Sequence, residues 1–192
     1  MDAALEIMGT QGWSATTVRG VCHEARLTPR FFYESFADID ALAVAVLDEI
    51  IVTATARVTE AILAADDEPE ARVRSAIEAM VDQLTEDPRR ARVAFVEALG
   101  SEPMMKRRLV ALHELAQFIA AQARATYHLP SGADAFVELT SIVLAGGLTE
   151  LMIVWLGGGL EMSRDELVDR CVELLVATGE GAAAIARTRH AP

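Results

Sequence analysis

One stretch, residues 16–36, limits what this chain can fold into more than any other: TTVRGVCHEARLTPRFFYESF. Four apolar residues in its first half recur at the spacing of a single helical face: Val18, Val21, Cys22 and Ala25. Thr16 can cap this first helix, and Arg26-Leu27 then forms a tight turn. Thr28 caps a second helix that begins with Pro29, where the missing N–H costs nothing.

The second helix is only about two turns long. It carries one arginine and three consecutive aromatic residues: Arg30, Phe31, Phe32 and Tyr33. One ring can face a core, so the others lie near solvent or a ligand. This layout is typical of a helix-turn-helix, whose second helix lies in the DNA major groove. Plain core packing is the alternative for each ring, and we accept it for Phe32 and Phe36.

Residues 4–42 resemble the N-terminal domain of the tetracycline-repressor (TetR) family of bacterial regulators. The matching residues are Ala4, Ile7, Gly12-Trp13, Thr16-Thr17-Val18-Arg19, Ala25, Leu27, Thr28, Phe32-Tyr33-Glu34-Ser35-Phe36 and Leu42. After about residue 50 only the helical layout is similar. Two residues depart from the family pattern. Arg26 stands where a left-handed glycine is usual, and Ile39 replaces a lysine that often binds a phosphate.

This resemblance and the residue types predict a set of DNA contacts: Thr17, Arg19, Thr28, Pro29, Arg30, Phe31 and Tyr33. Arg19 and Arg30 are expected to bind phosphates rather than to read bases. Their alternative role is that of solvated surface arginines. Tyr33 carries a polar tip suited to a phosphate or a base, and its position agrees with the family.

The charge of the chain argues against tight DNA binding by one copy. The formal net charge is −12 at pH 7. Residues 1–42 hold three arginines, at positions 19, 26 and 30, against six acids: Asp2, Glu6, Glu24, Glu34, Asp38 and Asp40. DNA affinity comes largely from phosphate neutralisation. We therefore expect weak binding by a single domain and doubled contacts in a dimer. A basic arm before Met1, which many relatives have, would strengthen binding further, and the sequence leaves open whether one precedes this chain.

Composition and periodicity predict an all-α fold of about nine helices. Hydrophobic residues make up 52% of the chain but aromatic residues only 5%, so an aliphatic, helical core is favoured. We predict a helix-turn-helix domain over residues 1–47 and a helical ligand-binding and dimerisation domain over residues 48–192. A capping box, Ser163 to Glu166, opens the last helix, whose end is expected to fray from Gly179.

Two functional surfaces are predicted in the larger domain. A small apolar effector is expected to bind in a cavity lined by Met80, Leu84, Phe95, Phe118 and Leu144. The last two helices are apolar enough to form a four-helix bundle with a second copy. The predicted dimer interface comprises Leu148, Leu151, Met152, Trp155, Leu167, Cys171, Leu174 and Leu175. Residues 139–160 also raise the question of a membrane span, but Glu150 favours a helix buried in protein.

The sequence shows no catalytic or metal-binding pattern. Its histidines are isolated: His23, His113, His128 and His190. Cys22 and Cys171 lack metal-ligand spacing and lie far apart, which fits a reducing cytoplasm. The first residues lack the basic flank of a signal peptide. We expect no enzyme activity, cofactor, metal or membrane partner.

The leading hypothesis is a homodimeric repressor that a small apolar molecule releases from a palindromic operator. The alternative is a helical small-molecule-binding or scaffold protein with weak or lost DNA binding, which the acidic first domain supports. The sequence does not decide between a repressor, which the leading hypothesis favours, and an activator. The sequence identifies neither the effector nor the operator.

Overall fold

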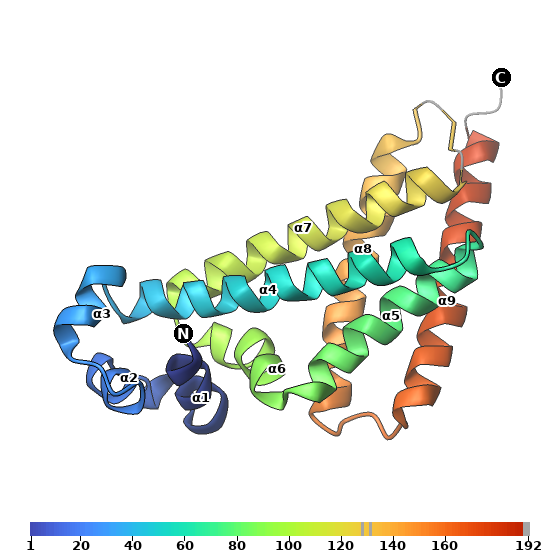
Figure 1. Cartoon of the computed structure of the whole chain (residues 1–192). Coiled ribbons are helices and arrows are strands. Elements are labelled where there is room, and N and C mark those ends of the chain that lie inside the picture. Colours follow the sequence, from blue (N-terminus) through green and yellow to red (C-terminus); the bar gives the residue numbers. More distant parts are fainter. Residues whose placement is uncertain (128, 131, 190–192) are drawn as a thin grey trace. The chain divides into compact units, whose positions relative to one another are not determined.

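The computed structural model describes residues 1–127, 129–130 and 132–189 (Figure 1). Its helices, including two short 3₁₀ turns labelled η, are α1 (Asp2–Gln11), η1 (Trp13–Ala15), α2 (Val18–Glu24), α3 (Pro29–Ser35), α4 (Ile39–Ala64), α5 (Pro69–Glu86), α6 (Pro88–Phe95), η2 (Glu97–Leu99), α7 (Glu102–Tyr127), α8 (Asp134–Leu156) and α9 (Arg164–Arg189). These ranges contain no strand, so the all-α prediction is confirmed. His128 and His190 lie outside the described residues.

Local capping signals account for several of the helix ends. Asp38 accepts a hydrogen bond from the Ala41 N–H at 2.8 Å at the start of α4. The predicted capping box before α9 forms, because the Ser163 N–H donates to Glu166 at 3.0 Å and the Glu166 N–H donates back at 3.3 Å. The expectation that the chain frays from Gly179 is wrong, since α9 continues to Arg189.

Packing divides the chain into two compact units. Unit 1 comprises Met1–Arg57 and Asp82–Val110, and unit 2 comprises Val58–Val81 and Ala111–Pro192. The predicted boundary after residue 47 falls inside unit 1, because α6 packs on α1. As a functional boundary it stays a prediction.

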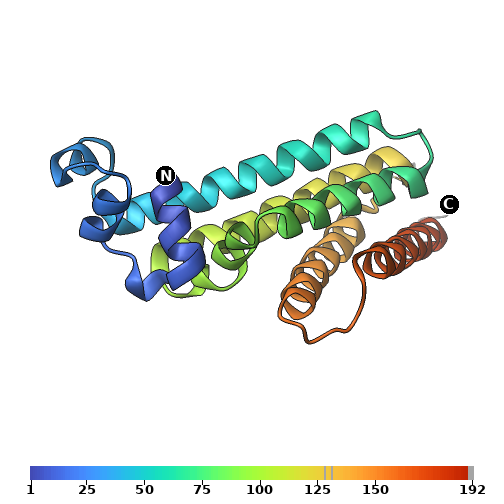
Figure 2. The ribbon, with the colours of Figure 1, turned by 60° about the horizontal axis from the view of Figure 1, so that its bottom comes forward.

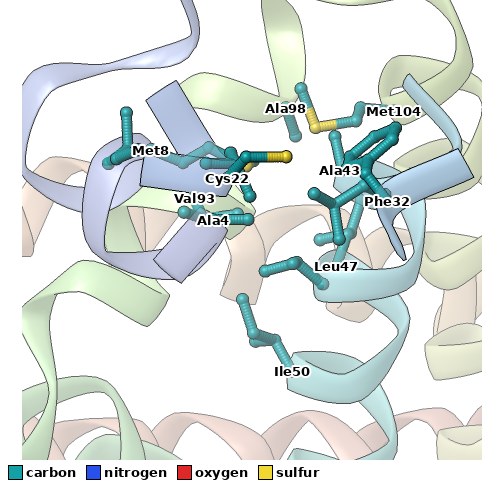
Figure 3. Packing of buried hydrophobic residues seen from close by; sticks show 14 residues of the cluster. Ala4, Met8, Cys22, Phe32, Ala43, Leu47, Ile50, Val93, Ala98 and Met104 are labelled. Carbon is teal, nitrogen blue, oxygen red and sulfur yellow. The ribbon is translucent and has the colours of Figure 1, made fainter. Parts of the chain in front are cut away.

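A single apolar cluster forms the core of unit 1 (Figure 3). Its buried members come from helices at both ends of the unit's sequence: Ala4, Ile7, Met8, Val21, Cys22, Phe32, Leu42, Ala43, Val46, Leu47, Ile50, Val93, Ala98 and Met104. Trp13 packs against this cluster, as expected, but remains partly exposed. Phe32 lies beside Ala43 and Met104 in Figure 3, so α3 is anchored to residues of α4 and α7.

Helices α1 and α6 approach each other at Gly9. A Cβ placed on Gly9 would lie 2.8 Å from the Arg89 Cα, a distance that real Cβ atoms avoid. The Arg89 guanidinium donates to Glu6 on α1 and, at 2.8 and 2.9 Å, to both carboxylate oxygens of Asp87. Hydrogen bonds from Arg89 lower the pKa of Asp87 below its ordinary value. Close packing and charge thus act together at this contact.

A second ionic group lies at the end of α6. Arg92 donates to Glu97 at 2.8 Å and to the Thr10 carbonyl at 3.0 Å. Glu97 also accepts a hydrogen bond from the Trp13 N–H at 2.7 Å. The end of α1 and Trp13 after it are therefore tied to α6 and η2 by two hydrogen bonds that involve a charged group.

Unit 2 is built on α7, α8 and α9 with residues of α4 and α5, and α8 and α9 lie side by side (Figure 2). A small apolar cluster joins the three helices: Ala120, Ala133, Val137 and Ala186. The Tyr127 ring covers Gly179, where a side chain would not fit. Arg74 on α5 binds Asp169 on α9 at 2.7 Å.

Replacing Gly9 with alanine should destabilise unit 1. The new Cβ would collide with the backbone of Arg89, and overpacking of this kind costs about 1–3 kcal/mol. Urea unfolding followed by circular dichroism measures the change.

The matched control is Gly181→Ala in α9, where an added Cβ meets nothing within 4 Å. Alanine there should stabilise the helix by about 0.5–1 kcal/mol. Equal effects of the two substitutions would show that α1 and α6 do not approach as described.

Candidate nucleic-acid interface

The first helix of the motif is capped by Thr17 rather than by Thr16. The Thr17 side chain accepts a hydrogen bond from the Gly20 N–H at 3.1 Å. Thr16 is buried instead, and its hydroxyl donates to the Gly12 carbonyl at 3.0 Å. The sequence-based assignment of Thr16 as the cap was wrong by one residue, because either threonine satisfies the local pattern.

The turn after α2 is a Schellman motif with arginine at the left-handed position. The Leu27 N–H donates to the Cys22 carbonyl at 2.8 Å, and the Arg26 N–H donates to the His23 carbonyl at 3.1 Å. Arg26 has φ 56°, the only positive φ of a non-glycine among the described residues. An arginine thus adopts the left-handed conformation in which glycine is usual, and the backbone there is strained.

Helix α3 begins at Pro29, as predicted, with Thr28 at its N-cap. The Thr28 side chain makes no capping hydrogen bond, so it caps by position alone. Phe32 is the one buried residue of α3. The Phe31 and Tyr33 residues on either side of it are 55% and 60% exposed.

Aromatic contacts hold the helix by its inner side. The Phe32 and Tyr33 rings meet edge to face, with their centroids 5.2 Å apart. Phe36 lies 5.8 Å from Phe32 and packs against the core cluster. Phe32 and Phe36 thus have the structural role expected for them, while Tyr33 keeps its hydroxyl end near solvent.

The charged groups at this surface largely offset one another. The Arg30 side chain is 86% exposed, and its Nε lies 3.1 Å from Glu34, one helical turn away. Arg19 and Arg26 are exposed as well. The acids counted in the sequence differ in their surroundings, since Glu6 binds Arg89 and Asp40 accepts from Ser101 within unit 1. Arg89 offsets the charge of Glu6, whereas the neutral Ser101 hydroxyl leaves the charge of Asp40 in place.

All seven residues predicted to contact DNA are exposed: Thr17, Arg19, Thr28, Pro29, Arg30, Phe31 and Tyr33. They belong to α2, α3 and the turn between them, so all lie in unit 1. Two neighbours were missed by the sequence reasoning. Leu27 is 53% exposed beside α3, and Glu34 neutralises Arg30. The spacing of four between Arg30 and Glu34 could have predicted that ion pair.

The residues predicted to line the effector cavity are divided between the two units. Leu84 and Phe95 belong to unit 1, and Met80, Phe118 and Leu144 to unit 2. Leu84 is buried and the other four are partly buried. A hollow of about 680 Å³ lies within unit 1 beside α1, α2 and α3, and none of these five residues lines it.

The predicted dimer residues fall on different sides of α8 and α9. Met152, Leu167 and Cys171 are buried within unit 2, so they pack in the protein's own core rather than facing a partner chain. Leu174 is exposed, while Leu148, Leu151, Trp155 and Leu175 are partly buried. Trp155 uses its indole N–H to bind the Met162 carbonyl at 2.9 Å.

Helix α8 exposes an apolar face that the sequence did not resolve: Leu139, Ile142, Val143 and Val154. By length and composition it is the one helix of the described ranges that could cross a membrane, which alone is weak evidence. Only 17% of its apolar window is buried within this chain, so the expectation that this helix is buried in protein, against a second copy, stays a prediction. Because the helix is apolar on nearly all sides, the sequence pattern did not show which side packs against the core.

The fold and the exposed second helix of the motif define a helix-turn-helix protein. Residues 1–46 match the model of a family described as bacterial regulatory proteins, tetR family. Residues 1–46 are therefore similar to the DNA-binding domain of the TetR family, in agreement with the resemblance inferred from the sequence. No curated protein matches the chain.

Solved structures share the fold over nearly the whole chain. The transcriptional regulator FadR from Bacillus subtilis, in complex with stearoyl-CoA, is 18% identical with a TM-score of 0.76, covering 92% of this chain and 96% of its own. The fatty acid degradation regulator FadR from Bacillus halodurans is 16% identical with a TM-score of 0.75, covering 91% of each chain. A TetR-family regulator from Bordetella parapertussis is 16% identical with a TM-score of 0.65, covering 91% and 90%.

Relieving the left-handed backbone at residue 26 should stabilise the protein. Arg26→Gly is expected to raise the free energy of unfolding by about 1 kcal/mol over Arg26→Ala, because only glycine adopts φ 56° without strain. Urea unfolding measures the free energy of unfolding of both variants. Both have lost the arginine charge, so the difference between them reports the backbone alone.

Arg19→Gly serves as the control on a residue inside α2. Glycine there should destabilise by about 0.5–1 kcal/mol, because it adds only backbone entropy to the unfolded chain. If Arg26→Gly were no more stable than Arg26→Ala, the turn would not be strained.

Proposed function

We propose that this protein is a homodimeric, ligand-responsive repressor that binds a palindromic operator and leaves it when a small apolar molecule binds. One observation carries the proposal. Phe32 anchors α3 to the core of unit 1, and the predicted DNA contacts around it are exposed. A helix held by one inner residue presents its remaining side chains to the major groove.

The exposed side chains divide by chemistry into two roles. Arg19, Arg30 and Tyr33 carry groups that bind phosphate oxygens and so fix the protein on the duplex. Thr28, Pro29 and Phe31 lie at the start of α3, the part of a recognition helix that contacts base edges. Thr17, at the N-cap of α2, completes the set beside the backbone of the DNA.

A second copy compensates for the low positive charge of this surface. Two copies double the phosphate contacts and make the two recognition helices read two half-sites about one DNA turn, roughly 34 Å, apart. The exposed apolar face of α8, with Leu174 of α9, is suited to such a contact. We prefer a protein partner to a membrane because Glu150 is exposed on this same helix.

The effector is proposed to be a small, mainly apolar molecule bound by helices of the larger domain. Its proposed contacts are the residues predicted from the sequence, of which Phe118 and Leu144 are apolar and partly buried in unit 2. Stearoyl-CoA is a suitable first probe, because the similar fold from Bacillus subtilis holds it. An effector that prefers a DNA-incompetent state shifts the population away from the operator.

A helical binding protein that has lost DNA binding is the second candidate. The Arg30–Glu34 ion pair favours it, because a recognition helix with a neutral outer side attracts phosphates weakly. The strained Arg26 turn and Ile39, in place of a common lysine, point the same way. The two candidates differ in whether binding to a duplex falls steeply as salt rises.

The decisive experiment is a mobility shift with the promoter region of the protein's own gene. We expect sub-micromolar affinity at low salt, a steep loss as salt rises, and release on addition of stearoyl-CoA. Glu34→Gln should bind about tenfold more tightly, because each Arg30 becomes free for a phosphate and the salt slope grows by about two per dimer.

Arg30→Ala and the double variant Arg30→Ala/Glu34→Gln complete the test. The gain from Glu34→Gln should be smaller without Arg30, because only the repulsion between carboxylate and phosphate is then removed. If neither wild type nor Glu34→Gln binds DNA with sub-micromolar affinity, the repressor proposal fails and the helical binding protein without DNA binding is left. If binding persists but stearoyl-CoA and shorter acyl-CoAs never release it, acyl-CoAs are ruled out as the effector.

The exposed face of α8 predicts the oligomeric state. In analytical ultracentrifugation we expect wild type at twice the 20.7 kDa chain mass and Val143→Glu at the monomer mass, because a charge would be buried in the interface. Leu63→Glu, on an exposed residue of α4, is the control and should remain dimeric. A wild-type monomer at micromolar concentration would rule out this interface.

A further inference from the structure

The side chains of α3 point in distinct directions around its axis. Successive residues of a helix turn by about 100°. Arg30 and Glu34 therefore lie opposite the buried Phe32. Phe31 and Tyr33 lie on the two flanks, about 160° from each other around the axis. Any duplex that receives the outer side of α3 must meet all four residues.

The two flanking aromatic residues differ in what they can bind. Tyr33 ends in a hydroxyl, which can donate to a phosphate oxygen or to a base. Phe31 has no polar atom, yet it is 55% exposed, and no ring contact to it is found among the described residues. A ring left in water gains free energy only by covering apolar surface. Phosphates and polar base edges do not offer such a surface.

A second apolar side chain lies beside Phe31. Leu27, in the turn before α3, is 53% exposed and borders the same hollow of about 680 Å³ as Phe31. Both residues belong to unit 1. Together they present an apolar surface at the start of the recognition helix, where base contacts are made.

The major groove contains one apolar group that distinguishes base pairs, the C5 methyl of thymine. We propose that Phe31, beside Leu27, packs on a thymine methyl and makes each half-site of the operator require thymine at one fixed position. This inference rests on the proposed function and specifies its DNA partner. It identifies Phe31 as a specificity-determining residue rather than a general anchor.

The Arg30–Glu34 ion pair on the outer side of α3 makes the contact between Phe31 and the thymine methyl more important for sequence specificity. Arg30 could read guanine with two hydrogen bonds, but Glu34 holds its Nε at 3.1 Å. Glu34 thereby occupies one of the five guanidinium N–H donors and restricts how the guanidinium can turn toward a base. A methyl contact by Phe31 is under no such restriction, because the ring is 55% exposed and makes no aromatic contact in the described part of the chain. Phe31 therefore distinguishes base pairs by an apolar contact, whereas Arg30, held by Glu34, is less able to do so by hydrogen bonds.

The experiment selects binding sites from a random duplex library of about 30 base pairs, long enough for two half-sites one turn apart. Full-length wild type, Phe31→Ala, Phe31→Leu and Leu63→Ala are each used for selection. We expect wild type, Phe31→Leu and the control Leu63→Ala to select thymine at one position of each half-site. Phe31→Ala should lose the preference at that position only.

Replacing the selected thymine with deoxyuridine then removes the methyl and nothing else. Loss of one buried methyl should weaken wild-type binding about fourfold, and loss in both half-sites about fifteenfold. Phe31→Ala should bind the two duplexes equally, which separates the contact from any change in DNA shape. Circular dichroism confirms that Phe31→Ala, a change at an exposed side chain, stays folded.

The outcomes separate this inference from the proposed function. Specific, salt-dependent binding without a fixed thymine, or with deoxyuridine tolerated by wild type, overturns the methyl contact alone. Uniform weakening of all sites by Phe31→Ala also overturns it, because that result indicates packing on the sugar-phosphate backbone. If wild type selects no sequence at all, the proposed function fails and the inference fails with it.

Discussion

The contact between α1 and α6 is the constraint on which the DNA-binding surface depends. Helices of seven to ten residues such as α1, α2 and α3 are marginal in isolation. Their core is completed by Val93, Ala98 and Met104, which lie about 55 to 65 residues after the start of α4 in the chain. Gly9 permits the close approach that brings α6 into this core. Without that approach, the first helices would bury too little apolar surface to fix α3.

This dependence suggests a physical route for regulation. Arg89 and Arg92 hold α6 against Glu6 and the Thr10 carbonyl of α1 through charged hydrogen bonds. Both arginines remain partly exposed, so these bonds are weaker than buried ones and can be exchanged for water. An effector that favoured a different position of α6 would act on the same core that anchors Phe32. The switch would require only two packings of similar free energy.

Local signals in the sequence predicted the helices well but not the packing between them. Asp38, Thr28-Pro29 and the Ser163–Glu166 capping box lie where helices begin, because capping is decided within a few residues. The choice of Thr17 over Thr16 escaped prediction because adjacent residues of the same type satisfy one pattern. The approach of Gly9 to Arg89 joins positions eighty residues apart, which no local pattern encodes. Helix α8 is apolar on nearly all sides, so its buried face could not be assigned.

The acidic character of the chain bears on how this surface would discriminate among DNA sequences. A strongly basic surface binds every duplex, since phosphate attraction does not depend on sequence. Here Glu34 pairs with Arg30, and the chain as a whole carries a net charge of −12. If the proposed function holds, this charge weakens binding to unrelated DNA and leaves the proposed contacts of Phe31 and Tyr33 at a fitting site in place. Low general affinity raises the ratio of specific to non-specific binding, which decides whether a regulator finds its operator among competing sites.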